Sequence, residues 1–177
     1  MNELHVVCGA PGAGKTTYAT QLARELGAAI FDSDQVTQRL VQAGLALAGL
    51  DVNDRDSPAY KKAYRDCVYE TLWDLAVIHG EHLPVVVAGP FTSECGDLSW
   101  PDKIHARTGK RAVIWFVQCS AEIRKQRIAA RGETRDEAKL LAWDEYRATC
   151  REEIPVFPCQ IVSNDNSLSP AVLTQPD

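Results

Sequence analysis

Residues 6–27, VVCGAPGAGKTTYATQLARELG, join an apolar run to a helical pattern through a glycine-rich turn. The P-loop or Walker A motif, G-x-x-x-x-G-K-[ST], is matched there by Gly9-Ala10-Pro11-Gly12-Ala13-Gly14-Lys15-Thr16. Its glycines let the backbone curl so that several N–H groups point inward at a helix N-terminus, and such a nest binds anions. A plain strand-to-helix turn would not need a lysine followed by a threonine. The stretch therefore predicts a nucleotide phosphate site from Gly9 to Thr17.

Two side chains of the motif predict the chemistry of the ligand. Lys15 is placed to reach the β- and γ-phosphates of a nucleotide, and the Thr16 hydroxyl takes a Mg²⁺ position. The sequence therefore predicts ATP and Mg²⁺ as cofactors, with Lys15 also acting on the transferred phosphoryl group.

Apolar runs alternate with helical patterns along the chain. We expect strands at residues 4–8, 28–31, 84–88, 112–117 and 160–162. These runs lack clean alternation, which is typical of strands covered on both faces. The pattern predicts an α/β P-loop NTPase fold, with a five-stranded parallel sheet and helices on both faces. We expect one domain over residues 1–177, with a loop after the last strand.

Helix boundaries are marked by capping residues. A helix over residues 14–26 follows the P-loop, and another begins at Ser57 as N-cap with Pro58 in its first turn. A third runs from Ser120 to residue 131, and Thr134 with Glu137 forms a capping-box pattern for a last long helix. The helix that begins at Ser57 is expected to turn six side chains inward: Tyr60, Tyr64, Cys67, Val68, Leu72 and Leu75.

Composition limits the possible partners. The net charge of −5 disfavours a nucleic-acid partner, because non-specific binding of nucleic acid requires neutralised phosphates. No apolar run approaches the ~20 residues of a membrane span, and the first residues lack a signal-peptide pattern, so we expect a cytoplasmic protein without a membrane partner. The six cysteines are irregularly spaced, and we expect neither zinc nor disulfides.

The class of P-loop protein depends on the other polar motifs. The segment SNDN at 163–166 lacks the N-K-x-D pattern that GTPases use for guanine. Carboxylates instead follow the second strand in IFDSDQ, where Asp32 is predicted to hold Mg²⁺ through water and Asp34 to orient or deprotonate an attacking hydroxyl. The alternative is a simple helix cap by Ser33 or Asp34.

A basic segment, AEIRKQRIAARGETRDE, follows the fourth strand. Arg124, Arg127 and Arg131 share one helical face, and Arg135 follows the helix end. Phosphoryl transfer needs positive charge that closes over the γ-phosphate, so Arg131 and Arg135 are predicted to form a lid. A solvated basic face is the alternative.

These motifs together resemble the small P-loop kinases of the nucleoside-monophosphate-kinase fold group. The resemblance is closest to polynucleotide 5′-hydroxyl kinase domains, zeta-toxin-like kinases and chloramphenicol-phosphotransferase-like enzymes, and it runs from the P-loop through DSDQVTQRL to RIAARGETRDE. It implies that Asp34 and Arg131 match the catalytic aspartate and the lid arginine of polynucleotide kinases. It also implies that Asn164 and Asp165 lie where related kinases wrap the adenine. The chain departs from polynucleotide kinases at Thr37, where they carry an arginine.

The sequence therefore predicts an ATP-dependent kinase that transfers the γ-phosphoryl group to a hydroxyl of a small molecule. Two alternatives stay open: a polynucleotide 5′-hydroxyl kinase acting on DNA or RNA, and a non-kinase ATP-binding switch or ATPase. Phe91, Thr92 and Arg55 are candidates for contact with the acceptor. A core position for Phe91 and a surface position for Arg55 are the alternatives.

Overall fold

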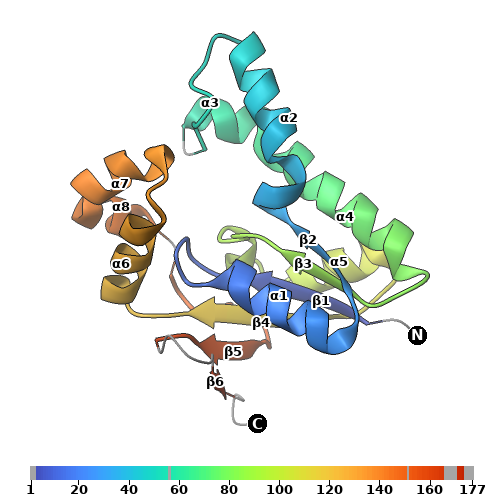
Figure 1. The fold of residues 1–177 in the computed structure, drawn as a ribbon. Coiled ribbons are helices and arrows are strands. Elements are labelled where there is room, and N and C mark those ends of the chain that lie inside the picture. The colour runs from blue at the N-terminus through green and yellow to red at the C-terminus, as the bar shows by residue number, and fades with distance from the viewer. Residues whose placement is uncertain (1–2, 56, 151, 166–170, 174–177) are drawn as a thin grey trace.

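The computed structural model describes residues 3–55, 57–150, 152–165 and 171–173 (Figure 1). Its sheet has the strand order β2-β3-β1-β4-β5-β6. The strands are β1 (Leu4–Cys8), β2 (Ala29–Asp32), β3 (Val85–Ala88), β4 (Ala112–Gln118), β5 (Gln160–Ser163) and β6 (Ala171–Leu173). The longer helices are α1 (Lys15–Leu26), α2 (Ser33–Leu47), α4 (Asp66–Gly80), α5 (Trp100–Thr108) and α6 (Ala121–Arg131). Shorter ones are α3 (Pro58–Tyr60), α7 (Glu137–Leu141) and α8 (Trp143–Thr149).

The predicted five-stranded parallel sheet is confirmed, since β1 to β5 pair only in parallel. The expectation of a loop after β5 is wrong in one respect, because β6 pairs antiparallel with β5. A sheet edge carries unpaired backbone N–H and C=O groups, and β6 covers this one. Three residues are too short a run for a strand signal in the sequence.

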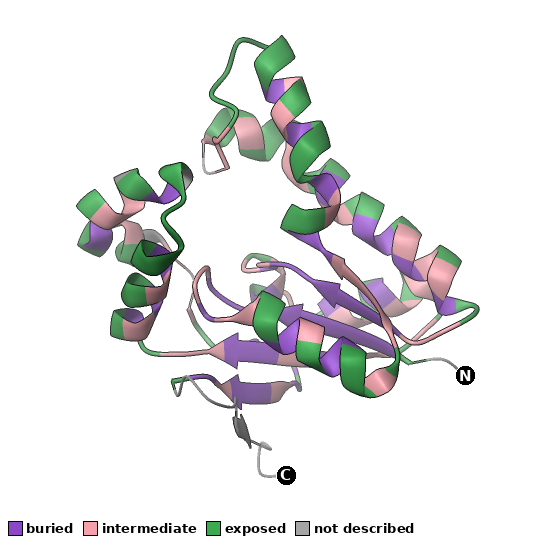
Figure 2. Cartoon of the chain, viewed as in Figure 1, coloured by how far each residue is buried: buried purple, intermediate pink, exposed green. Residues whose placement is uncertain are grey.

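Helices cover both faces of the sheet, and neighbouring strand residues face opposite layers. On one face, Val6 packs in a core with Leu72 of α4 and Ile104 of α5. On the other face, Val7 packs with Tyr18 and Leu22 of α1. Figure 2 shows the central strands as buried along their length. Burial on both faces explains the continuous apolar runs in the sequence.

The helix predicted from Ser57 is present, and its cap is confirmed: the Ser57 hydroxyl accepts a hydrogen bond of 3.0 Å from the N–H of Tyr60. The helix contains a π turn, Lys61–Arg65, between α3 and α4. A π turn holds more residues than an α-helical turn, and this shifts the buried face. The predicted inward position of Cys67 is therefore wrong, because Cys67 is exposed and Trp73 is buried instead.

The capping box predicted at Thr134 and Glu137 is also wrong. Residues Thr134–Asp136 form a 3₁₀ turn whose N-cap makes no side-chain bond, and α7 and α8 replace the long helix. The Asp136 carboxylate is fully buried and accepts from Arg131, and this contact ties the turn to the end of α6. The end of α6 itself is confirmed at Gly132.

The carboxyl ends of the parallel strands meet at one edge of the sheet, beneath the helical elements that rise on either side. Figure 1 shows α2 and α3 above one part of this edge, and α6, α7 and α8 above another. Ligands of such folds bind at this edge. In the described part of the chain, no helix has both the length and the apolarity needed to cross a membrane.

Candidate nucleotide-binding and phosphoryl-transfer site

The P-loop needs its glycines for shape and for close approach. Gly9 and Gly14 have φ angles of +138° and +95°, which L side chains rarely adopt. A Cβ atom at Gly9 would lie 2.2 Å from the carbonyl oxygen of Val117, and one at Gly14 would lie 2.1 Å from Nδ2 of Asn164. The loop is therefore pressed against β4 and the end of β5.

Side chains from other elements hold the loop from behind. Nε of Arg124 donates to the carbonyl oxygen of Pro11 at 2.9 Å, and Arg127 donates to that of Ala13 at 3.2 Å. Nδ2 of Asn164 donates to the same Ala13 oxygen at 2.9 Å. The donors of these three hydrogen bonds are buried or half-buried, and the bonds hold the loop in its conformation. The sequence placed Arg124 and Arg127 on a basic face but did not reveal this supporting role.

Lys15 lies at the floor of the site. Its Nζ donates to the carbonyl oxygen of Ala10 at 2.9 Å. Burial lowers the pKa of Lys15 to about 8, and the nearby carboxylates of Asp32 and Asp34 oppose this shift. Because burial disfavours the protonated form of Lys15, a bound anion would stabilise that form strongly. This is what the predicted binding of a nucleotide's phosphates requires.

Thr16 and Asp32 form a hydroxyl–carboxylate pair. The Thr16 hydroxyl donates to Oδ2 of Asp32 at 2.8 Å. Oδ1 of Asp32 accepts the backbone N–H groups of Asp34 at 3.0 Å and Gln35 at 3.2 Å, so Asp32 is the N-cap of α2. The alternative of a cap by Ser33 or Asp34 is therefore wrong. Hydroxyl and carboxylate oxygens are the ligands that Mg²⁺ prefers, and this pair fits a Mg²⁺ position.

Asp34 follows Asp32 by two residues and lies in the first turn of α2. Its side chain is exposed and lines the same cleft as Lys15 and Thr16. The structure thus separates the two carboxylates: Asp32 is buried against the P-loop and holds the helix start, whereas Asp34 faces the cavity.

Arg131 lines the cleft at the end of α6, and its Nε donates to Asp136 at 2.6 Å. The other oxygen of Asp136 accepts from Lys139 at 3.4 Å. The side chain of Arg135 lies outside the described part of the structure. The lid role of Arg131 and Arg135 stays a prediction, and the structure adds Arg127 and Lys139 to the basic groups of this wall.

Asn164 and Asp165 follow β5 and interact with protein groups. Asn164 is buried behind the P-loop, and Oδ1 of Asp165 accepts the N–H of Ser120 at 2.6 Å at the start of α6. Neither residue is among those that line the cleft. Their contact with adenine stays a prediction, while their support of the loop and of α6 is visible.

Lys15, Thr16, Asp32, Asp34 and Arg131 line one cleft of about 1070 Å³. On the P-loop and α6–α8 side its basic residues are Lys15, Arg127, Arg131 and Lys139. On the opposite side they are Arg55, Lys61, Lys62 and Arg65. Among the residues that the structure describes, the acidic ones that line it are Asp32, Asp34 and Asp66. The cleft is thus strongly basic in a chain whose net charge is −5.

The loop after β3 forms part of the cleft floor, where Thr92 lines the cavity as expected. Phe91 does not: it is fully buried, with its ring 4.7 Å from that of Tyr69, centroid to centroid. Its positive φ of 46° turns the side chain beneath the loop. Of the two alternatives for Phe91, the core position is therefore confirmed and the position in the acceptor pocket is wrong.

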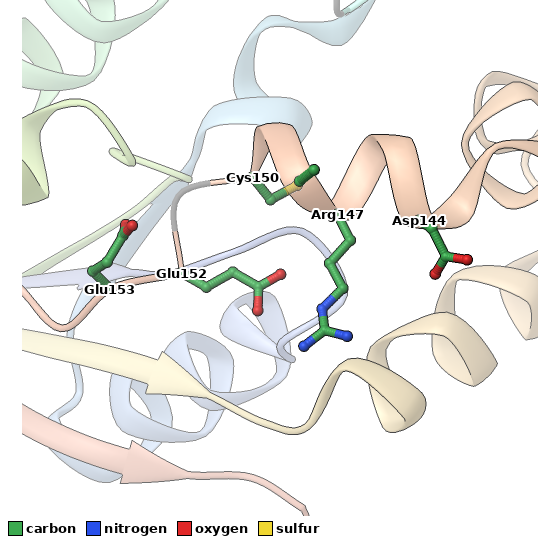
Figure 3. A pocket seen from close by; sticks show the side chains of 6 residues that line it. Asp144, Arg147, Cys150, Glu152 and Glu153 are labelled. Carbon is green, nitrogen blue, oxygen red and sulfur yellow. The ribbon is translucent and has the colours of Figure 1, made fainter.

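A second cavity of about 580 Å³ lies beside α8. Figure 3 shows its charged side chains: Asp144 and Arg147 project from α8, and Glu152 and Glu153 come from the segment that follows α8. Among the described residues that line it, Arg147 is basic and Asp144, Glu152 and Glu153 are acidic. Residues of the P-loop line the basic cleft and do not line this cavity, so the basic cleft is the candidate site.

This geometry defines a P-loop nucleotide-binding domain with its site at the carboxyl edge of a parallel sheet. The chain belongs to the AAA_33 family of AAA domains, whose family model matches residues 4–153. No curated protein matches the sequence.

Solved structures with a similar fold carry the names of kinases. A provisionally named kinase from Chloroflexus aurantiacus has a TM-score of 0.66 at 16% identity, covering 94% of this chain and 86% of that one. A sugar kinase from Janibacter sp. HTCC2649 has a TM-score of 0.59 at 17% identity, covering 92% and 86%. APS kinase from Mycobacterium tuberculosis, solved with AMPPNP and APS, has a TM-score of 0.57 at 16% identity, covering 94% and 90%. At these identities the likeness is one of fold, and it confirms the predicted α/β P-loop NTPase fold.

Proposed function

We propose that the protein is an ATP-dependent phosphotransferase that moves the γ-phosphoryl group to a hydroxyl of a small molecule. One observation carries this proposal: a P-loop with its lysine, a Thr16–Asp32 pair and a separate carboxylate, Asp34, all face one cleft. Nucleotide binding requires the first two features, and the third supplies a carboxylate that would accept the proton of an acceptor hydroxyl.

The residues of the cleft divide the work of the reaction. Backbone N–H groups from Gly12 to Thr16 and the Lys15 ammonium would bind the phosphates, and Thr16 with Asp32 would hold Mg²⁺. Bound there, Mg²⁺ would neutralise charge on the phosphate oxygens. Asp34 would accept the proton of the acceptor hydroxyl while the hydroxyl oxygen bonds to the γ-phosphorus. Arg131 and Arg135 would stabilise the charge that develops on the transferred group.

The comparisons support the proposal at the level of the fold. The structures named above are described as kinases, and one of them was solved in complex with AMPPNP and APS. A cleft of about 1070 Å³ exceeds the usual ~300–1,000 Å³ of a small-ligand site, which suits a nucleotide and a second small molecule side by side.

The direct test is a screen of hydroxyl compounds for ATP-dependent phosphorylation, read by mass spectrometry. The panel contains sugars, sugar acids, nucleosides, aminoglycoside and phenicol antibiotics, and 5′-hydroxyl oligonucleotides. We expect a phosphorylated small molecule with the wild type and none with Lys15→Ala. Lys103→Ala is the matched control, because Lys103 is an exposed lysine that pairs with Asp97 away from the cleft. ATP hydrolysis that no compound stimulates, with no phosphorylated product, would identify a switch or ATPase instead.

A further inference from the structure

The basic residues of the cleft form two groups on opposite walls. One group lies on the P-loop side, where a nucleotide's phosphates would bind. The other lies on the chain before and within the π turn, and it consists of Arg55, Lys61, Lys62 and Arg65. The P-loop motif gives this second group no role, and nothing in the phosphate cradle requires it.

The second wall is a built feature of the helix. Ser57 caps its start, and the π turn Lys61–Arg65 interrupts the α-helical repeat where the helix faces the cleft. The turn is supported by Tyr64, whose hydroxyl lies so close to Gly44 of α2 that a Cβ there would come within 2.2 Å of it. π-Helices are rare, and single π turns inside α-helices are frequently found at functional sites.

The charges of this wall differ in how they are compensated. Arg65 is neutralised, because its guanidinium donates to both oxygens of Glu94 at 2.9 and 2.8 Å. Arg55 instead donates to the main-chain oxygens of Val52 at 3.2 Å and Asp54 at 2.6 Å, and it lies over the Tyr60 ring at 5.4 Å.

Lys61 and Lys62 are exposed to the cleft. Within the described residues, no carboxylate forms an ion pair with Arg55, Lys61 or Lys62. Among the described residues of this segment, Asp66 is the acidic one that lines the cleft. Over the sequence, residues 55–66 contain four basic and two acidic side chains, so the segment keeps a net positive charge.

We propose that Arg55, Lys61 and Lys62, the acceptor wall, bind an oxyanion of the acceptor. This inference rests on the proposed kinase function, and it specifies the substrate class as a small hydroxyl compound that carries a phosphate, sulfate or carboxylate group. The acceptor wall would hold the anion while the hydroxyl lies at Asp34. The hydroxyl oxygen then bonds to the γ-phosphorus, the bond between this phosphorus and the β–γ bridging oxygen breaks, ADP leaves, and the proton passes to Asp34.

A small anion fits this wall better than a polynucleotide does. A polymer needs a basic track that continues beyond the cleft, and the chain as a whole is acidic at −5. The basic side chains that carry the inference are instead gathered inside one cavity of about 1070 Å³.

The first test measures anion binding without turnover. With saturating Mg·ADP on the P-loop, sodium sulfate is titrated into the wild type while backbone amides are followed by NMR. We expect saturable shifts for residues 57–66, lost in Lys61→Gln/Lys62→Gln. The matched control, Arg24→Gln/Lys103→Gln, removes two exposed positive charges outside the cleft and should behave as wild type. Absence of saturable shifts, or equal shifts in both double variants, would overturn the acceptor wall whether or not the protein is a kinase.

The second test uses turnover with matched acceptor pairs: ribose with ribose 5-phosphate, glucose with gluconate, and adenosine with adenosine 5′-phosphosulfate. We expect phosphorylation of an anionic member, with an acceptor KM about tenfold or more higher in Lys61→Gln/Lys62→Gln and an unchanged KM for ATP. Preference for a neutral member would refute the inference and leave the kinase function intact. Preference for a 5′-hydroxyl oligonucleotide over every small anion would replace it with a nucleic-acid substrate.

Discussion

Replacing Lys15 by methionine is expected to stabilise the nucleotide-free protein and to abolish Mg·ATP binding. Burial lowers the pKa of Lys15 from 10.5 to about 8, which means that folding penalises the protonated side chain. The gap of about 2.5 pH units corresponds to about 3 kcal/mol, at ~1.36 kcal/mol per unit. Because the side chain is partly open to the cleft, water reduces this cost, and we expect a gain of about 1–2 kcal/mol at pH 7.

The pH dependence identifies the cause of the gain. Below pH 8 both the folded and the unfolded wild type carry the proton, and the penalty is complete. Between pH 8 and 10.5 the folded protein has lost the proton while the unfolded chain still binds it, so wild-type stability rises with pH. The advantage of Lys15→Met should therefore narrow over this range.

Urea denaturation at pH 7 and pH 10 measures both effects. The control is Lys103→Met, an exposed lysine whose replacement should change stability little and equally at the two pH values. A Lys15→Met protein that is less stable than the wild type at pH 7, by the same amount at pH 10, would refute the buried-cation explanation.

Three further variants or conditions test other parts of the site. Arg131→Ala should lower kcat by on the order of 10²–10³ with little change in ATP affinity, since its charge would act on the transition state; a normal kcat with a raised KM for ATP would contradict this. Asp32→Ala should lower the free energy of unfolding by about 1–2 kcal/mol through loss of the α2 cap and should also weaken Mg²⁺-dependent nucleotide binding; urea denaturation and Mg²⁺ titration measure the two, and loss of neither would contradict the paired role. The affinity for Mg·ATP should fall about tenfold per pH unit above pH 8, because neutral Lys15 must take up a proton on binding. An affinity that does not change between pH 8 and pH 10 would contradict the lowered pKa.

The features that local sequence determines were predictable. The P-loop is a contiguous motif, and its glycine positions, its lysine and the Thr16 hydroxyl follow from what a phosphate nest requires. The five parallel strands were also predictable, because burial on both faces produces continuous apolar runs. Ser57 and Pro58 marked a helix start through capping chemistry that involves only neighbouring residues.

The features that were missed depend on contacts distant in the sequence. Arg124 and Asn164 support the P-loop only because β1 lies beside β4 and β4 beside β5, and one sequence does not state that order. The π turn at Lys61–Arg65 left no pattern of its own and shifted the buried face. In the sequence, Asp136 has the pattern of an exposed residue, but in the structure its carboxylate is buried and forms an ion pair with Arg131.

A substitution at Asp34 distinguishes the proposed kinase from a nucleotide-binding switch. Its carboxylate faces the cleft, whereas the α2 cap and the contact to Thr16 belong to Asp32. Asp34→Asn therefore leaves the cap, the P-loop and the predicted Mg²⁺ ligands in place and replaces the carboxylate that would accept the proton. The variant has nearly the same size, so the fold should be unchanged.

The most direct measurement is the single-turnover rate of phosphoryl transfer from ATP to the best acceptor of the screen, for the wild type and for Asp34→Asn. Melting temperature and Mg·ATP affinity are measured on the same samples. We predict a rate lower by about two orders of magnitude or more, with both other quantities close to wild type. An unchanged transfer rate, or no transfer to any hydroxyl by the wild type, would contradict the assignment of this cleft as a kinase active site.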